Sequence, residues 1–430
     1  MFHLGEGTFS GNQTMEKNMQ IKTGAHNAVW AIKRIVVPII ILAVYVVFAY
    51  IFSQHTPIYN PYGSGPGGEI QYDNATVLSI DEQAITASGF PGLYTGHQII
   101  TIRMNDGRYK GKTFQINNPL NYDTNFILHK GQKIVVTEST STGNKSYINV
   151  YMYAPNRLAP LFVLIALFVV ALCFVGGMRG FRSLLGIIFT LTTMLFVFVP
   201  LLYRGVSAVS ATLILVAVTS CVTLFLVAGV GRKSLSAILG TVAGVVISVI
   251  VMFVFSYFLS ISGYTSSDTD SLLNIAGGSH LQVHDLMFAG VIIASLGAVM
   301  DIAISVATSI NEVLEHKPDA DFKVLFSAGM NVGRDMMGTM VNTLILAFVG
   351  SSVISFILMY SYQAQFNQLF NSSGIAIDIL QAVCGSLAVI LTVPIVSAIS
   401  GKLLSGTGGS NRQLPPQNPK NAAVEENMHS

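Results

Sequence analysis

Eight stretches of about 18 or more mainly apolar residues follow one another along the chain. They lie near 35–52, 158–178, 183–203, 206–229, 235–261, 284–310, 338–360 and 376–400. A helix of that length crosses the roughly 30 Å hydrocarbon core of a bilayer. Backbone groups cannot stay unpaired in lipid, and a transmembrane barrel would show alternation over about ten residues instead. The pattern therefore predicts an α-helical membrane protein with about eight transmembrane helices.

One long polar segment, 53–157, separates the first apolar stretch from the others. Within it, short alternating runs are divided by turn residues such as Asn105-Asp106-Gly107. The runs are Thr76–Ile80, Gln98–Met104, Thr113–Asn117, Lys133–Glu138 and Tyr147–Tyr153. Such runs are typical of a small β-barrel or sandwich. We expect an all-β domain of OB-like or lipoyl-like size, either a spacer or assembly domain or one that captures a substrate or partner.

Composition supports the membrane class and excludes several others. Asp, Glu, Lys and Arg together make up only 10% of the 430 residues, against about 25% in soluble domains. The basic residues sit at the ends of apolar stretches and form no surface stripe, so nucleic-acid binding is not expected. Cys173, Cys221 and Cys384 all lie inside apolar stretches, which predicts neither a disulfide framework nor a cysteine metal site.

The basic residues also orient the chain. They flank alternate loops, as Lys33, Arg34, Arg179, Arg182, Arg232, Lys233, Lys317, Lys323, Arg334 and Lys402. The positive-inside rule then places both termini in the cytoplasm and 53–157 outside. Val47-Phe48-Ala49 could end a cleaved signal peptide, but the preceding region exceeds the usual pattern, so we expect a retained anchor.

This orientation predicts five parts of the chain. They are a disordered cytoplasmic tail at 1–28, a first transmembrane helix at 29–52, an extracytoplasmic β-domain at 53–157, a seven-helix bundle at 158–403 and a second disordered tail at 404–430. The tails are polar and lack periodicity.

Asp301 is the sharpest candidate for chemistry. It lies about sixteen residues, roughly 24 Å, from the outer end of the sixth stretch, so it cannot easily reach either surface. No predicted span has a Lys or Arg in its interior. The carboxyl must therefore be protonated, hydrogen-bonded by neutral groups or paired with a bound cation. Because an acid at this depth is expensive, we favour a functional role over a packing role.

A polar stripe extends from this carboxyl. Ser305, Thr308 and Glu312 follow at helical spacing, and we expect the stripe to face the bundle interior or a water-filled path. The seventh span repeats the spacing with Asn331, Asp335, Gly338, Thr339 and Asn342, beside Thr343. If the two helices are antiparallel neighbours, Asn342 and Thr343 come within a turn or two of Asp301 in depth.

The predicted ion- or proton-binding site therefore comprises Asp301, Ser305, Thr308, Asn342 and Thr343. Its carboxylate, hydroxyl and amide oxygens suit a proton or a hard cation. The alternative for the neutral residues is that they hydrogen-bond between helices and hold the bundle together.

Glu312, Arg334 and Asp335 are predicted at the cytoplasmic boundary, as a gate or as an ordinary solvated charge cluster. This places Asp335 about one leaflet from Asp301, which disfavours an intramembrane aspartyl pair. Neither a P-loop nor HExxH or GxSxG occurs in the sequence. We expect a protein that is not an enzyme and has no cofactor.

Two further patterns have a structural and a functional interpretation. His280 and His284, followed by Asp285, could share a metal if the stretch is helical, with Asp268 or Asp270 as a further ligand; otherwise they belong to a solvated loop. The glycine pairs Gly240/Gly244 and Gly329/Gly333 have GxxxG spacing, which predicts close helix packing.

Several strings together resemble one family. They are Met300-Asp301-Ile302-Ala303 with Ser305 and Glu312, the run Gly333-Arg334-Asp335-Met336-Met337-Gly338-Thr339-Met340-Val341-Asn342-Thr343-Leu344, Gly107-Arg108-Tyr109-Lys110-Gly111-Lys112, and Gly176-Gly177. In these the chain resembles the YibE/F-like family of bacterial multi-pass membrane proteins over most of residues 70–400. The resemblance implies a bacterial plasma membrane and an extracytoplasmic β-domain ahead of a helical bundle. It leaves the activity to be argued from the residues.

Two functions from different classes follow, and a third, an ion channel, would differ from a transporter in turnover and not in any visible motif. We expect a secondary transporter or permease in which Asp301 binds the coupling proton or a cation. The alternative is a membrane scaffold whose β-domain recruits an envelope partner. Expected partners are the lipid bilayer, a proton or inorganic cation, and either a second copy or an envelope protein.

Overall fold

The computed structural model describes residues 36–56, 70–122, 124–141, 147–261, 264, 269–277 and 280–405. The predicted tail 1–28, nearly all of 404–430, and Asp268 lie outside the described residues. Two compact units divide the chain. The β unit is Thr56–Leu184 with Asp270–Leu281, and the helical unit holds the rest.

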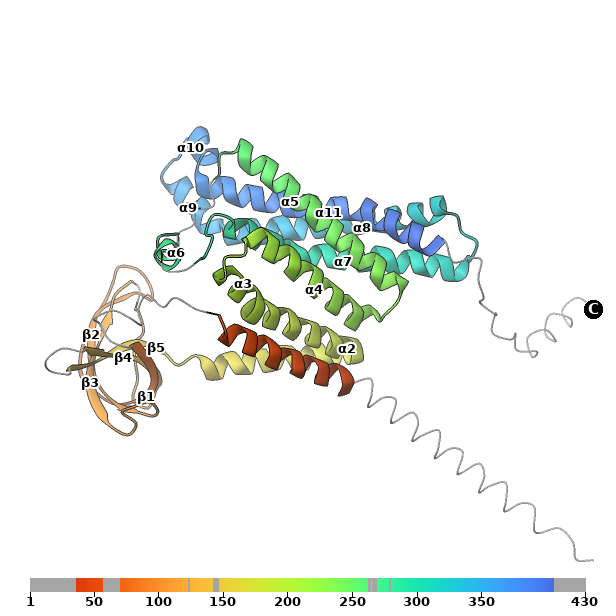
Figure 1. Ribbon diagram of the computed structural model, residues 1–430. Helices are drawn as coiled ribbons and strands as arrows, with labels where there is room; N and C mark the ends of the chain where they lie inside the picture. The colour runs from red at the N-terminus through yellow and green to blue at the C-terminus, as the bar shows by residue number, and fades with distance from the viewer. Residues whose placement is uncertain are drawn as a thin grey trace, which may run out of the picture. The chain divides into compact units, whose positions relative to one another are not determined.

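The predicted β-domain is one curled five-stranded antiparallel sheet (Figure 1). Its strands are β1 Ile70–Ala87, β2 Tyr94–Met104, β3 Thr113–Leu120, β4 Lys133–Ser141 and β5 Tyr147–Pro155. The strand order is β3-β2-β1-β4-β5, and β3 also contacts β5. Register shifts after Val77 and Ile80 let the long β1 bend between β2 and β4. This order in a single sheet favours the OB-like over the lipoyl-like alternative.

Alternation along the strands explains the core of this domain. Ala75 and Val77 of β1, Ile100 and Ile102 of β2, and Ile134 of β4 are buried, while the residues between them point outward. Successive strand residues face opposite sides of a sheet, so each strand contributes one apolar face.

The helices are α2 Leu158–Thr193, α3 Val199–Tyr203, α4 Ala208–Ala228, α5 Arg232–Phe258, α6 Thr269–Ala276, α7 Leu286–His316, α8 Phe322–Ser351, α9 Val353–Ser361, α10 Phe366–Phe370 and α11 Ser373–Ser405. A helix over Val36–Gln54 precedes the sheet, and the π-helical turn η1, Met194–Phe198, joins α2 to α3.

The number of helices differs from the predicted eight. Among the described residues, six helices are long and apolar enough to cross a membrane, or seven if α8 and α9 form one bent span. The difference arises because the predicted spans 158–178 and 183–203 fall in one helical run of 46 residues, Leu158–Tyr203. A straight helix of 46 residues would be about 69 Å long at 1.5 Å per residue, over twice the hydrocarbon thickness, but the run consists of two helices joined at a kink. Gly177 breaks it with φ 53° and ψ −133°.

The predicted seventh span also has different bounds. The helix α8 begins at Phe322, well before 338, and the chain bends by 55° between α8 and α9. The predicted span starts at 338 because polar residues become rare only there. The helix itself starts earlier, because the preceding segment contains Ala, Met and Lys, which are good helix formers. Arg334 and Asp335 therefore lie inside a long helix and not at its end.

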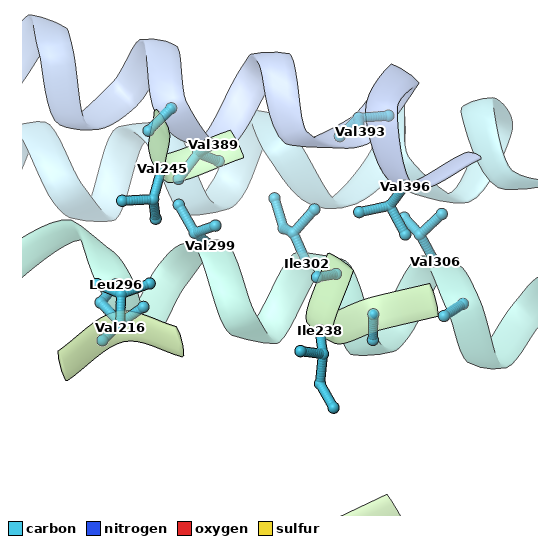
Figure 2. Packing of buried hydrophobic residues seen from close by; sticks show 14 of the residues in the cluster. Val216, Ile238, Val245, Leu296, Val299, Ile302, Val306, Val389, Val393 and Val396 are labelled. Atoms are coloured by element: carbon cyan, nitrogen blue, oxygen red, sulfur yellow. The ribbon is translucent and has the colours of Figure 1, made fainter. Parts of the chain in front are cut away.

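The core of the helical unit is centred on α7, which contacts α4, α5, α8 and α11 (Figure 1). Val299, Ile302 and Val306 of α7 pack toward Val389 and Val396 of α11 (Figure 2). Since these side chains recur at helical spacing, one face of α7 is buried along most of its length.

Both predicted glycine pairs are packing sites, as expected. A Cβ atom on Gly240 or Gly244 of α5 would overlap Val396 or Thr392 of α11. On α8, a Cβ atom on Gly329 would lie 2.6 Å from Ser397 Oγ, and one on Gly333 would overlap Val393. Two GxxxG seams therefore hold α11 between α5 and α8.

Candidate functional site

Asp301 lies at the middle of α7, fifteen residues from Leu286 and fifteen from His316. Its side chain is exposed on the face of α7 opposite the buried one, whereas Val299 and Ile302 point into the core (Figure 2). Among the described residues, Asp301 makes no hydrogen bond and no ion pair. Within the helical unit, Asp301 therefore does not face the bundle interior, and the other alternative, a water-filled path, stays a prediction.

The other members of the α7 stripe follow the same face with varied exposure. Ser305 and Thr308 are half-buried, and Glu312 is exposed. The carbonyl of Ser305 accepts a hydrogen bond from Ser309 Oγ at 3.1 Å, within the same helix.

On α8, Asn342 and Thr343 are both exposed. The hydroxyl of Thr343 donates to the carbonyl of Thr339 at 2.9 Å, one turn earlier. In the described structure, none of the five residues of the predicted ion site makes a side-chain hydrogen bond to a neighbouring helix. Nothing in the described contacts therefore assigns them a role in holding the helices together.

Contacts between the helices set the depth of Asp301. A Cβ atom on Gly329 would lie 2.7 Å from Cδ1 of Ile310, so these residues mark one level on antiparallel α8 and α7. Asp301 precedes Ile310 by nine residues, so on the antiparallel α8 it is level with the residue nine positions after Gly329, which is Gly338. A second route leads through α11. Ser295 of α7 meets Gly385 of α11, so Asp301 is level with residue 391 of α11; Val393 of α11 meets Gly333 of α8, so residue 391 is level with Asp335. Asp301 is thus level with the turn between Asp335 and Gly338.

This register corrects the predicted charge cluster. Arg334 and Asp335 are exposed on α8 near the depth of Asp301, while Glu312 lies three turns further along α7. The three side chains do not lie at one level, and Arg334 lies inside α8 and not at its end. Asn342 and Thr343 lie one to two turns from Asp301 in depth, on the side toward Leu286. The depth argument against an aspartyl pair therefore no longer holds.

Two histidine–carboxylate contacts are found among the described residues, and neither involves these charges. They are His97 with Glu82 at 4.0 Å and His284 with Asp285 at 2.7 Å. Asp301, Arg334 and Asp335 thus make up a set of two acids and one base at similar depth without a close ion pair.

The predicted histidine metal site is not assembled. Residues 280–285 are not helical, so His280 and His284 are not on one helical face. Nδ1 of His284 instead contacts Oδ1 of Asp285 at 2.7 Å. Within the described part of the chain, no group of three or more His, Cys, Asp or Glu side chains could hold a metal ion.

Sequence reasoning missed a set of buried hydroxyls. Ser220 and Thr223 of α4, and Ser397 and Ser400 of α11, have buried oxygens without a hydrogen-bond partner in the described structure. Hydroxyls are common in apolar helices, and no spacing distinguishes these four from the others. Only packing shows which of them are enclosed.

A second missed feature is a carboxyl pair in the β unit. Glu138 is 3% exposed, and its Oε1, like Oδ2 of Asp73, has no partner among the described residues. Burial, then the hydrogen bond and charge of Asp73, raises the pKa of Glu138 to about 7, against the opposing charge of Arg108. The inward positions Ile134, Val136 and Glu138 alternate along β4, which is a signal that the sequence did contain.

Comparisons with known proteins support one family. A family model described as YibE/F-like protein matches residues 164–406. The match covers α3 to α11 and most of α2, and so includes Asp301 and the polar face of α8. Searches of the curated proteins and of the solved structures give no significant match.

Proposed function

The chain belongs to the YibE/F-like family, and we propose that it is an integral membrane secondary transporter or permease for an ion or a small solute. In this proposal the Asp301 carboxyl binds the proton or cation. The membrane is the bacterial plasma membrane, with both termini cytoplasmic and the β-domain outside, as the distribution of Lys and Arg predicts.

The observation that carries the proposal is the carboxyl at the middle of α7, level with a second acid on α8. An ionised Asp at the centre of a membrane helix costs roughly 2.5–3.5 kcal/mol or more. Asn would hydrogen-bond between helices at a lower cost. The expense of Asp301 and Asp335 therefore favours a role in which a carboxylate binds and releases a proton or a cation.

Ser305 and Thr308 lie within two turns of Asp301 on the same face and supply hydroxyl oxygens. Asn342 and Thr343 extend the polar face of α8 toward Leu286. Hard cations and protons favour such oxygen ligands. Movement of α8 along the seam of Gly329 and Gly333 would alter access to Asp301, because glycines leave little side chain to obstruct sliding.

The test uses purified full-length protein in proteoliposomes with a pH-sensitive dye inside. Monovalent cations, divalent cations and small organic solutes are added outside in turn. We expect one class of solute to drive proton movement in the wild type, and Asp301→Asn to abolish it. Glu315→Gln removes a carboxyl near the end of the same helix and serves as the control that retains flux.

Unchanged flux and unchanged pH dependence in Asp301→Asn would refute the assigned role of this carboxyl. Absence of movement with every solute, from protein whose thermal unfolding remains cooperative, would favour the second function below.

The second function is a membrane scaffold, and a surface on the β unit favours it. Tyr72 of β1 and Tyr151 and Tyr153 of β5 are each more than half exposed. The rings of Tyr72 and Tyr153 lie 4.9 Å apart, so they form one aromatic surface. Tyrosine is enriched at protein interfaces, where a large rigid ring contributes contact area. In this alternative the β-domain binds an envelope protein while the helices serve as the anchor.

A further inference from the structure

Two groups of glycines in the helical unit differ in their surroundings. Those of the two GxxxG seams contact α11, and a Cβ atom there would meet other atoms at once. Gly290 and Gly297 of α7 and Gly338 of α8 are exposed, and a Cβ atom there would meet no atom within 4 Å. These three therefore leave room next to α7 and α8 that no described residue occupies.

The exposed face of α7 also differs in composition from its neighbours. The helices α4, α5 and α11 expose large apolar side chains such as Ile214, Ile250 and Val383, as lipid-facing helices do. All of α7 is described, and none of its large apolar residues is exposed. In their place, Gly290, Ala294, Gly297 and Asp301 follow one another along the outer face.

We propose that this outer face of α7 packs against the same face of a second copy, so that the Asp301 carboxyls of the two copies complete one ion site at the interface. The inference rests on the proposed role of Asp301 in ion binding. It adds the partner that the site requires.

Symmetry makes this pairing specific. Two copies with one orientation in a membrane are related by a twofold axis along the membrane normal, so the two α7 helices run parallel. Each residue then meets its counterpart at the same depth, which brings Asp301 opposite Asp301. Gly290, Ala294 and Gly297 have the small side chains that let two helix backbones approach closely.

A second copy also supplies what the other described spans lack. The helix Val36–Gln54 and the first part of α2 expose mainly apolar side chains. Tyr45 is the one polar side chain near the middle of that first helix, and it already bonds Thr193 at 2.8 Å. If a helix of this kind packed on the outer face of α7, it would bury Asp301 without a polar partner, at a cost of several kcal/mol. The matching face of another copy brings a second Asp301 carboxyl at the same depth.

Two carboxyls at one site cannot easily ionise together, so they would share one proton or hold one cation between them. The exposed Asp301 carboxyls of α7 would then lie between two proteins and not in lipid.

Disulfide cross-linking in membranes tests the contact. The background is full-length protein in which Cys173, Cys221 and Cys384 are replaced by alanine and transport is retained. Ala294→Cys places a thiol on the proposed face. Ile250→Cys is the matched control, at a similar depth on the exposed, apolar face of α5. With a membrane-permeable oxidant, we expect a severalfold stronger dimer band for Ala294→Cys, since paired Cβ atoms must come within about 4.5 Å.

Equal cross-linking of the two variants would overturn the proposal. A second measurement does not depend on thiol geometry. Gly297→Trp should shift the mass of the detergent-solubilised protein from dimer to monomer, whereas Gly350→Trp, on the open surface of α8, should not. A monomeric wild type would also overturn the proposal.

The outcomes separate this inference from the proposed function. If Asp301→Asn abolishes flux but Ala294→Cys does not cross-link, the transport role holds and the shared site fails. If cross-linking succeeds while Asp301→Asn transports normally, the dimer holds and the ion site fails. Should both hold, co-reconstituting wild type with excess Asp301→Asn should lower flux below that of the wild type alone.

Discussion

Glu138 makes the β-domain sensitive to pH through a single side chain. Its pKa is raised from 4.5 to about 7, mainly by burial. Between these values the folded chain keeps a proton that the unfolded chain has lost. The free energy of unfolding therefore falls as pH rises from about 4.5 to 7, and it changes no further above that range.

We predict that Glu138→Gln removes this dependence, because the amide stays neutral. The wild type should lose about 3 kcal/mol across the window, at 1.36 kcal/mol per pKa unit. Amide hydrogen exchange of β1 and β4 in the solubilised protein, corrected for intrinsic rates, measures the change. Glu82→Gln, an exposed carboxyl of the same domain, should retain the slope. A flat profile in the wild type would contradict the raised pKa.

Asp301 and the α8 charges show what residue patterns can and cannot predict. An acid in an apolar run is visible in the sequence, and so is Ser305, the polar residue that follows it by four positions. The face that it occupies is not visible, because α7 carries apolar residues on both sides of the stripe. Burial of Val299 and Ile302 against α11 decides that Asp301 points outward.

At the scale of elements, the break at Gly177 determines how α2 is divided. Its φ of 53° with ψ of −133° is accessible mainly to glycine. The preceding Gly176 has room for a side chain and no positive φ, which makes it a matched control.

We predict that Gly177→Ala lowers the thermal midpoint of the solubilised protein. The strain of a non-glycine residue at such a backbone angle is about 1–3 kcal/mol. Gly176→Ala should leave the midpoint unchanged or raise it slightly, because alanine favours the helix. Equal midpoints for the two variants would show that the break does not need a glycine.

Element bounds were predictable to different degrees. The five strands were found because period-two alternation is a local signal that turns interrupt. The start of α8 was missed, since a hydropathy window responds to charge while the helix continues through Lys323, Arg334 and Asp335. Tertiary contacts of Gly329 and Gly333 with α11 stabilise this polar part of the helix.

The whole molecule joins a β unit to a helical unit, and the two proposed functions place the activity in different units. The transporter acts through the helical unit alone, whereas the scaffold acts through the β unit. Removing the β-domain therefore distinguishes them.

We predict that a chain lacking residues 56–155 retains part of its flux in proteoliposomes. The deletion joins the helix Val36–Gln54 to α2 on one side of the membrane, so the predicted orientation of the other helices is kept. A milder variant, Tyr72→Ser with Tyr151→Ser and Tyr153→Ser, should leave flux unchanged. Complete loss of function in both variants, with normal folding, would favour the scaffold.

The sequence alone determined the helical class, the position of the β-domain, the family and the presence of an acid in the sixth span. These properties depend on composition and on local period, which every residue carries with it. Tertiary structure alone decided that the glycines of α5 and α8 enclose α11, that Gly290 and Gly297 face open space, and that Asp335 shares the depth of Asp301. Those properties depend on which helices become neighbours and in what register. Helices that are apolar on every side do not encode that choice locally.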